Sequence, residues 1–150
     1  MSRAFVKESE GAVEPLPDRL ISPHPNLVTR EGLHLIDVHL ERLRQEHAAA
    51  GDDRDKLATI ARDLRYWVAR RATAQLVSEP ADASEVRFGA TVTIDRDGRR
   101  QSYRIVGEDE ADPARGTISY VSPLARALTG KAVGDVVPAG NAEAEILEIR

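Results

Sequence analysis

The fold of this chain is decided by the stretch Phe88-Gly89-Ala90-Thr91-Val92 and by two blocks that follow it, Ile105-Val106-Gly107-Glu108-Asp109-Glu110-Ala111-Asp112 and Ser122-Pro123-Leu124-Ala125-Arg126-Ala127-Leu128. The first block, and the start of the second, belong to short apolar runs that are typical of strands. The third block begins with serine, a favoured helix N-cap, and proline follows at the first helical position. It therefore predicts a short helix.

Outward from these blocks, the second half of the chain shows alternating apolar residues and turn signals. Asp97-Gly98 predicts a tight hairpin turn between the first two strands. The predicted strands are Val86–Ile94, Gln101–Val106, Thr117–Val121, Val133–Val137 and Ala144–Ile149. With the helix at Pro123–Leu128 they predict a small antiparallel sheet and one short helix.

Residues 29–78 show helical spacing instead. Thr29 is a plausible N-cap, Gly51 a helix stop, and Asp52 or Asp53 a cap for a second helix. Seam residues, mostly apolar, recur three or four positions apart in two narrow rows. The first seam consists of Leu33, Ile36, Leu40, Leu43 and His47, and the second of Leu57, Ile60, Leu64 and Trp67. Such seams favour a coiled coil, although periodicity alone equally allows two helices of a small bundle. The short break between the seams predicts an antiparallel hairpin.

The sequence therefore predicts an α+β protein in four parts. The parts are an irregular arm at 1–28, a helical hairpin at 29–78 with its tip near 51–55, a linker at 79–84 and a β domain at 85–150. The arm is rich in proline, and we expect it either to be disordered or to fold back over the body through Leu20 and Ile21.

Composition excludes several classes of protein. The 150 residues carry a net charge of −4, which argues against a general nucleic-acid coat. No cysteine is present, so neither disulfides nor a cysteine zinc site is expected. The four histidines have no metal-binding spacing, and Gly130-Lys131 lacks the upstream glycine of a P-loop. Without an apolar leader or a long apolar run, a soluble cytoplasmic protein with no membrane partner is expected.

The three blocks, together with Leu27-Val28-Thr29-Arg30-Glu31-Gly32, resemble the Gre transcript-cleavage factors (GreA and GreB) of bacterial RNA polymerase over about residues 27–150. The resemblance implies a C-terminal domain similar to FK506-binding proteins (FKBP-like) that docks on the polymerase. It also implies a helical hairpin that enters the secondary channel and meets the nascent RNA 3′ end. Such a factor is not itself an enzyme and has no cofactor of its own, because it acts through the active site of the polymerase. A monomer is expected.

The resemblance also implies a role for the hairpin tip. In the family, two tip carboxylates after a glycine help to hold the second magnesium ion at the active site of the polymerase. Hydrolysis of RNA by two metal ions requires hard oxygen ligands for the metal. Gly51-Asp52-Asp53-Arg54-Asp55-Lys56 occupies that place, and Asp52 and Asp55 match the two acidic positions, with aspartate for glutamate at the second. From the residues alone, carboxylates at a helix N-terminus are more often caps and partners of the helix dipole.

Two further sets of residues are candidates by resemblance. The second limb is rich in arginine, and Arg54, Arg62 and Arg65 are the candidates for contacts with RNA phosphates, the alternative being a solvated helix face. Arg71 falls on the seam and is expected to be structural. The candidates for polymerase docking are Glu108, Asp109, Glu110, Asp112, Ser122, Pro123 and Arg126, and no intrinsic metal site is expected although the acidic run resembles a cation site.

The length of the hairpin argues against cleavage. Each limb is about eleven residues shorter than in a Gre factor that cleaves, a loss of nearly three whole turns that preserves the seam. The tip then retreats by about 16 Å, whereas a metal ligand must lie within about 2.5 Å. The resemblance therefore favours a Gre-family factor that occupies the channel without cutting, with a shortened hairpin that is Rnk-like in that respect.

Three alternatives remain. The first is a full cleavage stimulator that uses the tip carboxylates and the polymerase magnesium. The second is an FKBP-like peptide-binding module, which Phe88, Tyr103 and Tyr120 alone support poorly. The third is a self-associating coiled-coil adaptor.

Overall fold

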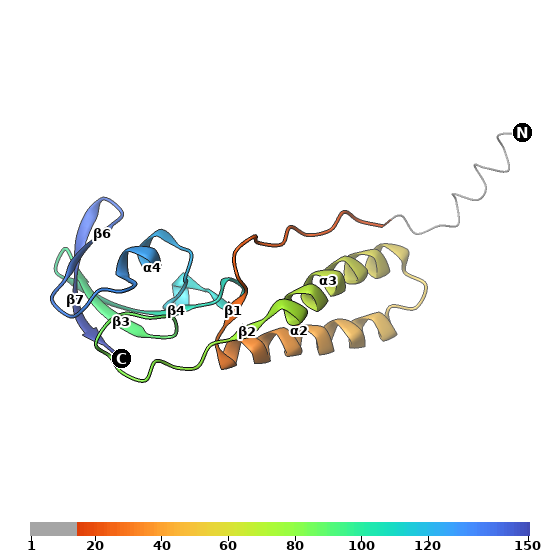
Figure 1. Cartoon of the computed structure of the whole chain (residues 1–150). Coiled ribbons are helices and arrows are strands. Elements are labelled where there is room, and N and C mark those ends of the chain that lie inside the picture. The colour runs from red at the N-terminus through yellow and green to blue at the C-terminus, as the bar shows by residue number, and fades with distance from the viewer. Residues whose placement is uncertain (1–14) are drawn as a thin grey trace, which may run out of the picture. The chain divides into compact units, whose positions relative to one another are not determined.

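The structure is a computed structural model that describes residues 15–150. It forms two compact units, one containing residues 15–22 and 36–72, the other residues 23–35 and 73–150. The first unit holds most of the helical hairpin, and the second holds the β-sheet together with the first turns of the first long helix (Figure 1).

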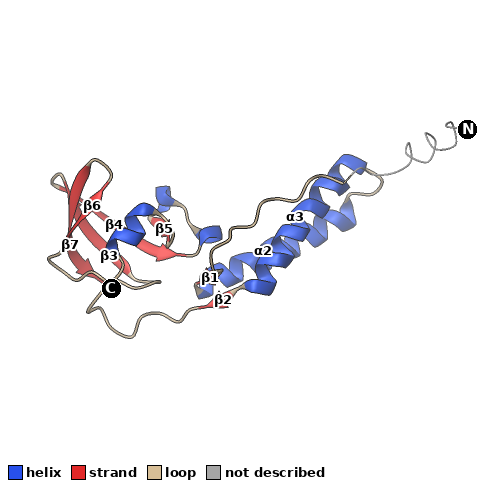
Figure 2. Ribbon diagram, turned by 45° about the horizontal axis from the view of Figure 1, so that its top comes forward, coloured by secondary structure: helices blue, strands red, loops and turns tan. Residues whose placement is uncertain are grey.

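The hairpin consists of two helices of equal length, α2 (Arg30–Ala49) and α3 (Arg54–Thr73). Both are 20 residues long, and they run antiparallel as the sequence predicts (Figures 1 and 2). The buried apolar residues between them lie on the predicted seam positions and on two alanines, namely Ile36, Leu40, Leu43, Ala50, Ala58, Ile60 and Trp67. The ring of His39 also stacks on Trp67, with 4.1 Å between their centroids.

The seam differs from the prediction at both ends. His47 is exposed rather than part of the core. At the other end, Arg70 is buried to 2% exposure, whereas Arg71 lies on the surface and pairs with Asp37 of the facing helix at 2.8 Å. From Trp67 a seam can continue at either the third or the fourth residue, and the prediction of Arg71 as the seam position was wrong by this one step.

The second unit is built on a five-stranded sheet in the order β5-β4-β3-β7-β6. The strands are β3 (Thr91–Arg96), β4 (Arg99–Val106), β5 (Thr117–Ser119), β6 (Val136–Ala139) and β7 (Ala142–Ile149). The β3–β4 hairpin turns at Asp97 and Gly98, both at positive φ, as the sequence predicts. All pairs are antiparallel except β4–β5, so the sheet is mixed and not purely antiparallel.

Two predicted strands begin too early. Val86 and Ala90 are buried, but β3 begins only at Thr91, because Gly89 has a φ of +88° and donates its N–H to the carbonyl of Ile105 at 2.8 Å. The strand predicted at Val133–Val137 is β6, which begins at Val136. Before β3, the buried residues therefore begin earlier in the sequence than the hydrogen-bonded strand.

The short helix α4 (Pro123–Leu128) forms over the predicted residues. The hydroxyl of Ser122 accepts a hydrogen bond from the N–H of Ala125 at 3.3 Å, which caps the helix as the sequence indicates. Ala125 and Leu128 are fully buried and pack into the core of the sheet. That core consists mainly of Val, Ile and Ala side chains, with Phe88, Tyr103 and Tyr120 packed against it.

A two-residue parallel ladder within the second unit joins the segments on either side of the helical hairpin. It joins β1 (Leu27–Val28) to β2 (Gln75–Leu76), which precede α2 and follow α3. The Asn26 side-chain amide donates to the Thr73 hydroxyl at 3.2 Å and extends the contact. The α+β class with a helical hairpin and a small β domain is thus confirmed, and this ladder is an addition that the sequence did not predict.

Within the described part of the chain, no helix has the length and apolar character needed to cross a membrane.

Candidate functional site

The hairpin tip presents three aspartates. Asp52, Asp53 and Asp55 are all exposed, and they follow Gly51, whose φ of +59° ends α2. Asp53 accepts a hydrogen bond from the N–H of Lys56 at 3.1 Å, so it is the N-cap of α3. Asp52 lies in the turn and Asp55 in the first turn of the helix. One of the three carboxylates thus has a structural role, and it is not one of the two candidate metal ligands.

This division predicts different costs for the three aspartates. Replacing Asp53 with alanine is expected to destabilise the hairpin by about 1 kcal/mol, because the Lys56 N–H loses its acceptor. Replacing Asp52 is expected to cost less than about 0.5 kcal/mol. Urea denaturation followed by the fluorescence of Trp67, the only tryptophan, measures both changes. An equal cost at the two positions would contradict the assignment of Asp53 as the cap.

The arginine-rich face of α3 contacts the segment at residues 16–19. The Arg65 guanidinium pairs with the Asp18 carboxylate and donates to the Leu16 carbonyl at 3.0 Å. Arg62 pairs with its neighbour Asp63 at 3.2 Å. Arg54 is exposed in the first turn of α3 near the tip. The three candidate RNA contacts therefore lie along one helix, and Arg65 is held by the chain's own N-terminal segment.

The prediction for the arm was wrong about the residues that make the contact. Of the predicted arm, residues 1–14 lie outside the described part of the chain. Leu20 is 95% exposed and Ile21 49% exposed, so these two side chains do not hold the segment. The contact is made by polar groups instead, including Arg19, which lies over the Tyr66 ring at 3.9 Å. The approach of Asp18 and Arg19 to charged groups on a helix far along the chain carries no local sequence signal.

Glu110, a predicted docking residue, faces inward. Its carboxylate accepts hydrogen bonds from the N–H of Thr29 at 3.0 Å, from the Thr29 hydroxyl and from the N–H of Gly107 at 3.2 Å. The Thr29 hydroxyl in turn accepts from the N–H of Gly32 at 3.0 Å, which confirms Thr29 as the N-cap of α2. A β-carbon on Gly32 would lie only 2.1 Å from the Glu110 carboxylate. Glu110 therefore binds the beginning of α2.

The other acidic candidates surround this contact. Glu108 and Asp109 belong with Glu110 to a 3₁₀ turn, and both are partly buried. Asp112 begins the next turn, and its carboxylate lies 3.6 Å from Arg115. Among the described residues, no group of three or more His, Cys, Asp or Glu side chains is arranged to hold a metal ion.

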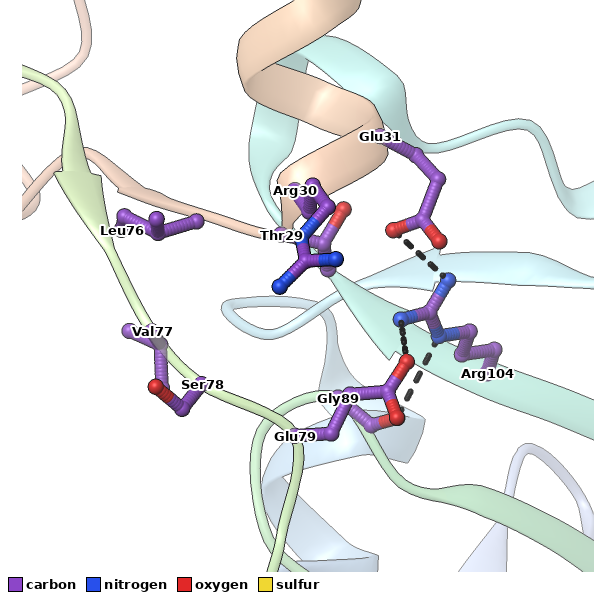
Figure 3. A pocket seen from close by; sticks show the side chains of 9 residues that line it. All are labelled: Thr29, Arg30, Glu31, Leu76, Val77, Ser78, Glu79, Gly89 and Arg104. Atoms are coloured by element: carbon purple, nitrogen blue, oxygen red, sulfur yellow. Dashed lines mark hydrogen bonds and ion pairs between the residues drawn. The ribbon is translucent and has the colours of Figure 1, made fainter.

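A polar pocket lies beside the beginning of α2 and is centred on Arg104 (Figure 3). Its guanidinium lies 3.3 Å from the Glu31 carboxylate and 3.8 Å from that of Glu79, and it donates to the Gly89 carbonyl at 3.2 Å. A hydrogen bond from the backbone N–H of Glu31 to its own carboxylate lowers the pKa of Glu31 below the ordinary 4.5; burial opposes this shift, and the charge of Arg104 adds to it. Glu31 and Gly89 belong to two of the blocks quoted from the sequence, but no sequence pattern joins them to Arg104, because the members of the cluster come from separate segments of the chain.

The exposed face of α4 borders an apolar cavity of about 470 Å³. Phe88 and Tyr120 form an edge-to-face pair in its wall, 5.7 Å between centroids, and the Tyr120 hydroxyl donates to the Pro25 carbonyl. Among the docking candidates, Arg126 lines this cavity and is exposed, Pro123 is exposed at the helix start, and Ser122 serves as the cap. The lining residues are His24, Pro25, Leu27, Phe88, Ile105, Tyr120, Val121, Arg126 and Thr129.

Comparisons with known proteins agree on one family. Residues 81–150 match the family model described as transcription elongation factor, GreA/GreB, C-terminal. The chain is 37% identical over 151 residues to transcription elongation factor GreB of Yersinia pestis, covering 83% of this chain and 88% of the relative. It is 39% identical over 119 residues to GreA of Alkalilimnicola ehrlichii, covering 74% and 73%.

Among solved structures, the chain is similar to GreA factor homolog 1 (Gfh1) of Thermus thermophilus, with 23% identity, a TM-score of 0.41, and coverage of 85% of this chain and 99% of that one. The sequence relatives span both the helical and the β-sheet parts, at identities above 30%. The chain therefore belongs to the GreA/GreB family of transcription elongation factors.

Proposed function

We propose that this protein binds bacterial RNA polymerase through its β-sheet unit and places its helical hairpin in the secondary channel, where it acts on paused or backtracked complexes. The observation that carries the proposal is the cluster of exposed carboxylates at the end of an antiparallel hairpin, in a chain of the GreA/GreB family. The protein is not an enzyme in this proposal, and the magnesium ion belongs to the polymerase. The site of action is the cytoplasm, where that polymerase works.

The proposal favours occupancy of the channel over stimulated cleavage. Each helix has 20 residues, which corresponds to a length of about 30 Å. A full cleavage stimulator is expected to have about three more turns in each limb. Since a metal ligand must approach within about 2.5 Å, a deficit of about 16 Å leaves Asp52 and Asp55 out of reach if docking is as in the family.

The docking surface is assigned to the exposed end of α4 and its neighbours. Arg126 and Pro123 are accessible beside the apolar cavity, and both are candidates for direct contact. Glu110 is reassigned from direct contact to a positioning role, since its carboxylate is engaged with Thr29 and Gly107. In this proposal the protein acts as a monomer and contacts the nascent RNA 3′ end.

The test is a transcript-cleavage experiment on halted, backtracked polymerase. We expect this protein to produce no shortened RNA, and to suppress the shortening stimulated by an authentic GreB in proportion to its concentration. Arg126→Ala is expected to weaken this suppression several-fold, whereas Arg150→Ala, another exposed arginine, should not.

Two results would change the conclusion. Shortened RNA that disappears in Asp52→Ala/Asp55→Ala would establish the alternative, a cleavage stimulator. If the protein causes neither shortening of the RNA nor suppression of GreB-stimulated shortening, binding in the channel is refuted.

The peptide-binding alternative receives limited support from the apolar cavity. Phe88 and Tyr120 provide an aromatic wall, as such a module requires. However, Pro25 of the same chain lines the cavity, and its carbonyl accepts the hydrogen bond of the Tyr120 hydroxyl. A proline-containing peptide would have to displace this segment, so we favour the polymerase as partner.

A further inference from the structure

We propose that residues 16–19 form a displaceable latch that covers a phosphate-binding face on α3 and so lowers the affinity of the hairpin for RNA. The proposal deepens the proposed function and rests on it for the identity of the ligand, single-stranded RNA. The latch consists of Leu16, Asp18 and Arg19, and the covered face of Asp63, Arg65 and Tyr66.

The latch makes four polar contacts with the covered face. Arg65 is held twice, by the Asp18 carboxylate and by the Leu16 carbonyl. Arg19 is also held twice, since its guanidinium lies 3.5 Å from the Asp63 carboxylate and over the ring of Tyr66. Both views show the segment running beside α3 (Figures 1 and 2). The contact is specific, because each charged group of the segment meets its opposite or an aromatic face.

The chemistry of Asp18 matches that of the expected ligand. A carboxylate and a phosphate present the same kind of anionic oxygen to a guanidinium, and arginine binds both through paired N–H donors. Asp18 therefore occupies one of the N–H donors, at Nε, with which Arg65 would bind an RNA phosphate, and the Leu16 carbonyl occupies a second donor at Nη2. Asp63 has a related effect on the same helix, since its carboxylate holds both Arg62 and Arg19.

The contacts are weak enough to be displaced. The Arg65 side chain is 42% exposed and that of Asp18 73% exposed, so water and salt screen the pair. An exposed pair of this kind changes an equilibrium constant by about two- to fivefold. The latch therefore lowers RNA affinity without preventing binding, and a backbone that offers several phosphates can replace Asp18.

The first experiment measures binding of a fluorescein-labelled single-stranded RNA to the isolated 150-residue chain by anisotropy, at one fixed low salt concentration. Asp18→Asn is expected to increase the affinity about two- to fivefold over the unaltered protein. Arg65→Gln is expected to decrease it, and Asp18→Asn/Arg65→Gln should show no gain over Arg65→Gln alone.

Asp37→Asn is the matched control. It changes the net charge by the same amount and releases another arginine of α3, Arg71, but it leaves the latch intact. An equal gain from Asp37→Asn and Asp18→Asn would refute the latch, because general electrostatics would then account for both. So would an unchanged affinity of Asp18→Asn.

The second experiment observes the latch directly through the single tryptophan. Trp67 lies next to Tyr66, and the Arg19 guanidinium is 5.9 Å from its ring. RNA is expected to change the Trp67 emission of the unaltered protein as Arg19 moves away, and Asp18→Asn should show part of that change without RNA. Identical emission in Asp18→Asn and the unaltered protein, with or without RNA, would refute displacement.

The two proposals fail in different ways. The latch is tested without polymerase, whereas occupancy of the channel is tested by suppression of GreB-stimulated cleavage. Suppression without an effect of Asp18→Asn on RNA affinity would overturn the latch alone. A gain in RNA affinity without suppression would support the latch and overturn occupancy of the channel.

Discussion

Replacing Gly107 with alanine is expected to destabilise the β-sheet unit by about 1–2 kcal/mol. The backbone of Gly107, with φ −71° and ψ 165°, suits alanine, so the change should by itself stabilise by about 0.4–1 kcal/mol through the unfolded chain. The added β-carbon, however, would lie 2.3 Å from the carbonyl oxygen of Leu27. Because this neighbour is backbone in β1, it cannot rotate away, and overpacking of this kind costs about 1–3 kcal/mol.

Gly130→Ala separates collision from backbone strain. Gly130 has a φ of +84°, and no atom lies within 4 Å of the place that a β-carbon would take, so alanine there meets strain alone, about 1–2 kcal/mol. Urea denaturation followed by circular dichroism measures both variants. A neutral or stabilising Gly107→Ala would show that β1 moves aside easily, and would contradict a tight contact between Gly107 and Leu27.

Replacing Glu110 with glutamine is expected to cost about 2 kcal/mol. The carboxylate accepts three hydrogen bonds, two of them from Thr29 at the beginning of α2, where the helix dipole also favours negative charge. Hydrogen bonds to a charged acceptor contribute more than neutral ones, and glutamine turns one of the two acceptor atoms into a donor that faces other donors. Glutamine retains the size and shape of glutamate, so the decrease in the free energy of unfolding measures the contribution of the charge and the hydrogen bonds.

Glu145→Gln is the control for Glu110→Gln. The Glu145 side chain is exposed on β7, and its replacement should change the free energy of unfolding by less than about 0.5 kcal/mol. Hydrogen exchange at the Thr29 amide adds a local measurement, since that N–H donates to Glu110. Unchanged protection of Thr29 in Glu110→Gln would contradict the role of the carboxylate as an anchor for α2.

The sequence predicted those elements whose signals are local. Ser122 and Pro123 predict α4 because a cap and a first-turn proline act within one turn, and Asp97-Gly98 predicts the β3–β4 turn because its conformation depends on two residues. The exposed tip was also predictable, since Gly51 and the aspartates mark a helix stop and a start. Period alone could not decide between Arg70 and Arg71, which lie three and four residues after Trp67.

The rest depends on contacts between distant parts of the chain. Thr29 and Glu110 are 81 positions apart, and Asp18 and Arg65 are 47 apart. Nothing in the composition of either partner indicates which acid meets which donor, so the sequence predicts Glu110 as a surface residue and gives Asp18 no role. Only the folded chain shows that one carboxylate binds the beginning of a helix and the other an arginine.

The β1–β2 ladder makes the hairpin an insertion between two paired strands of the β-sheet unit. Because Leu27–Val28 and Gln75–Leu76 lie side by side, the segments before α2 and after α3 are joined within the β-sheet unit, whatever the length of the helices in between. Equal insertions of about eleven residues in both limbs keep the seam in phase, since they add nearly three whole turns to each helix. The length of the hairpin can therefore change in steps of about three turns without any change to the β-sheet unit.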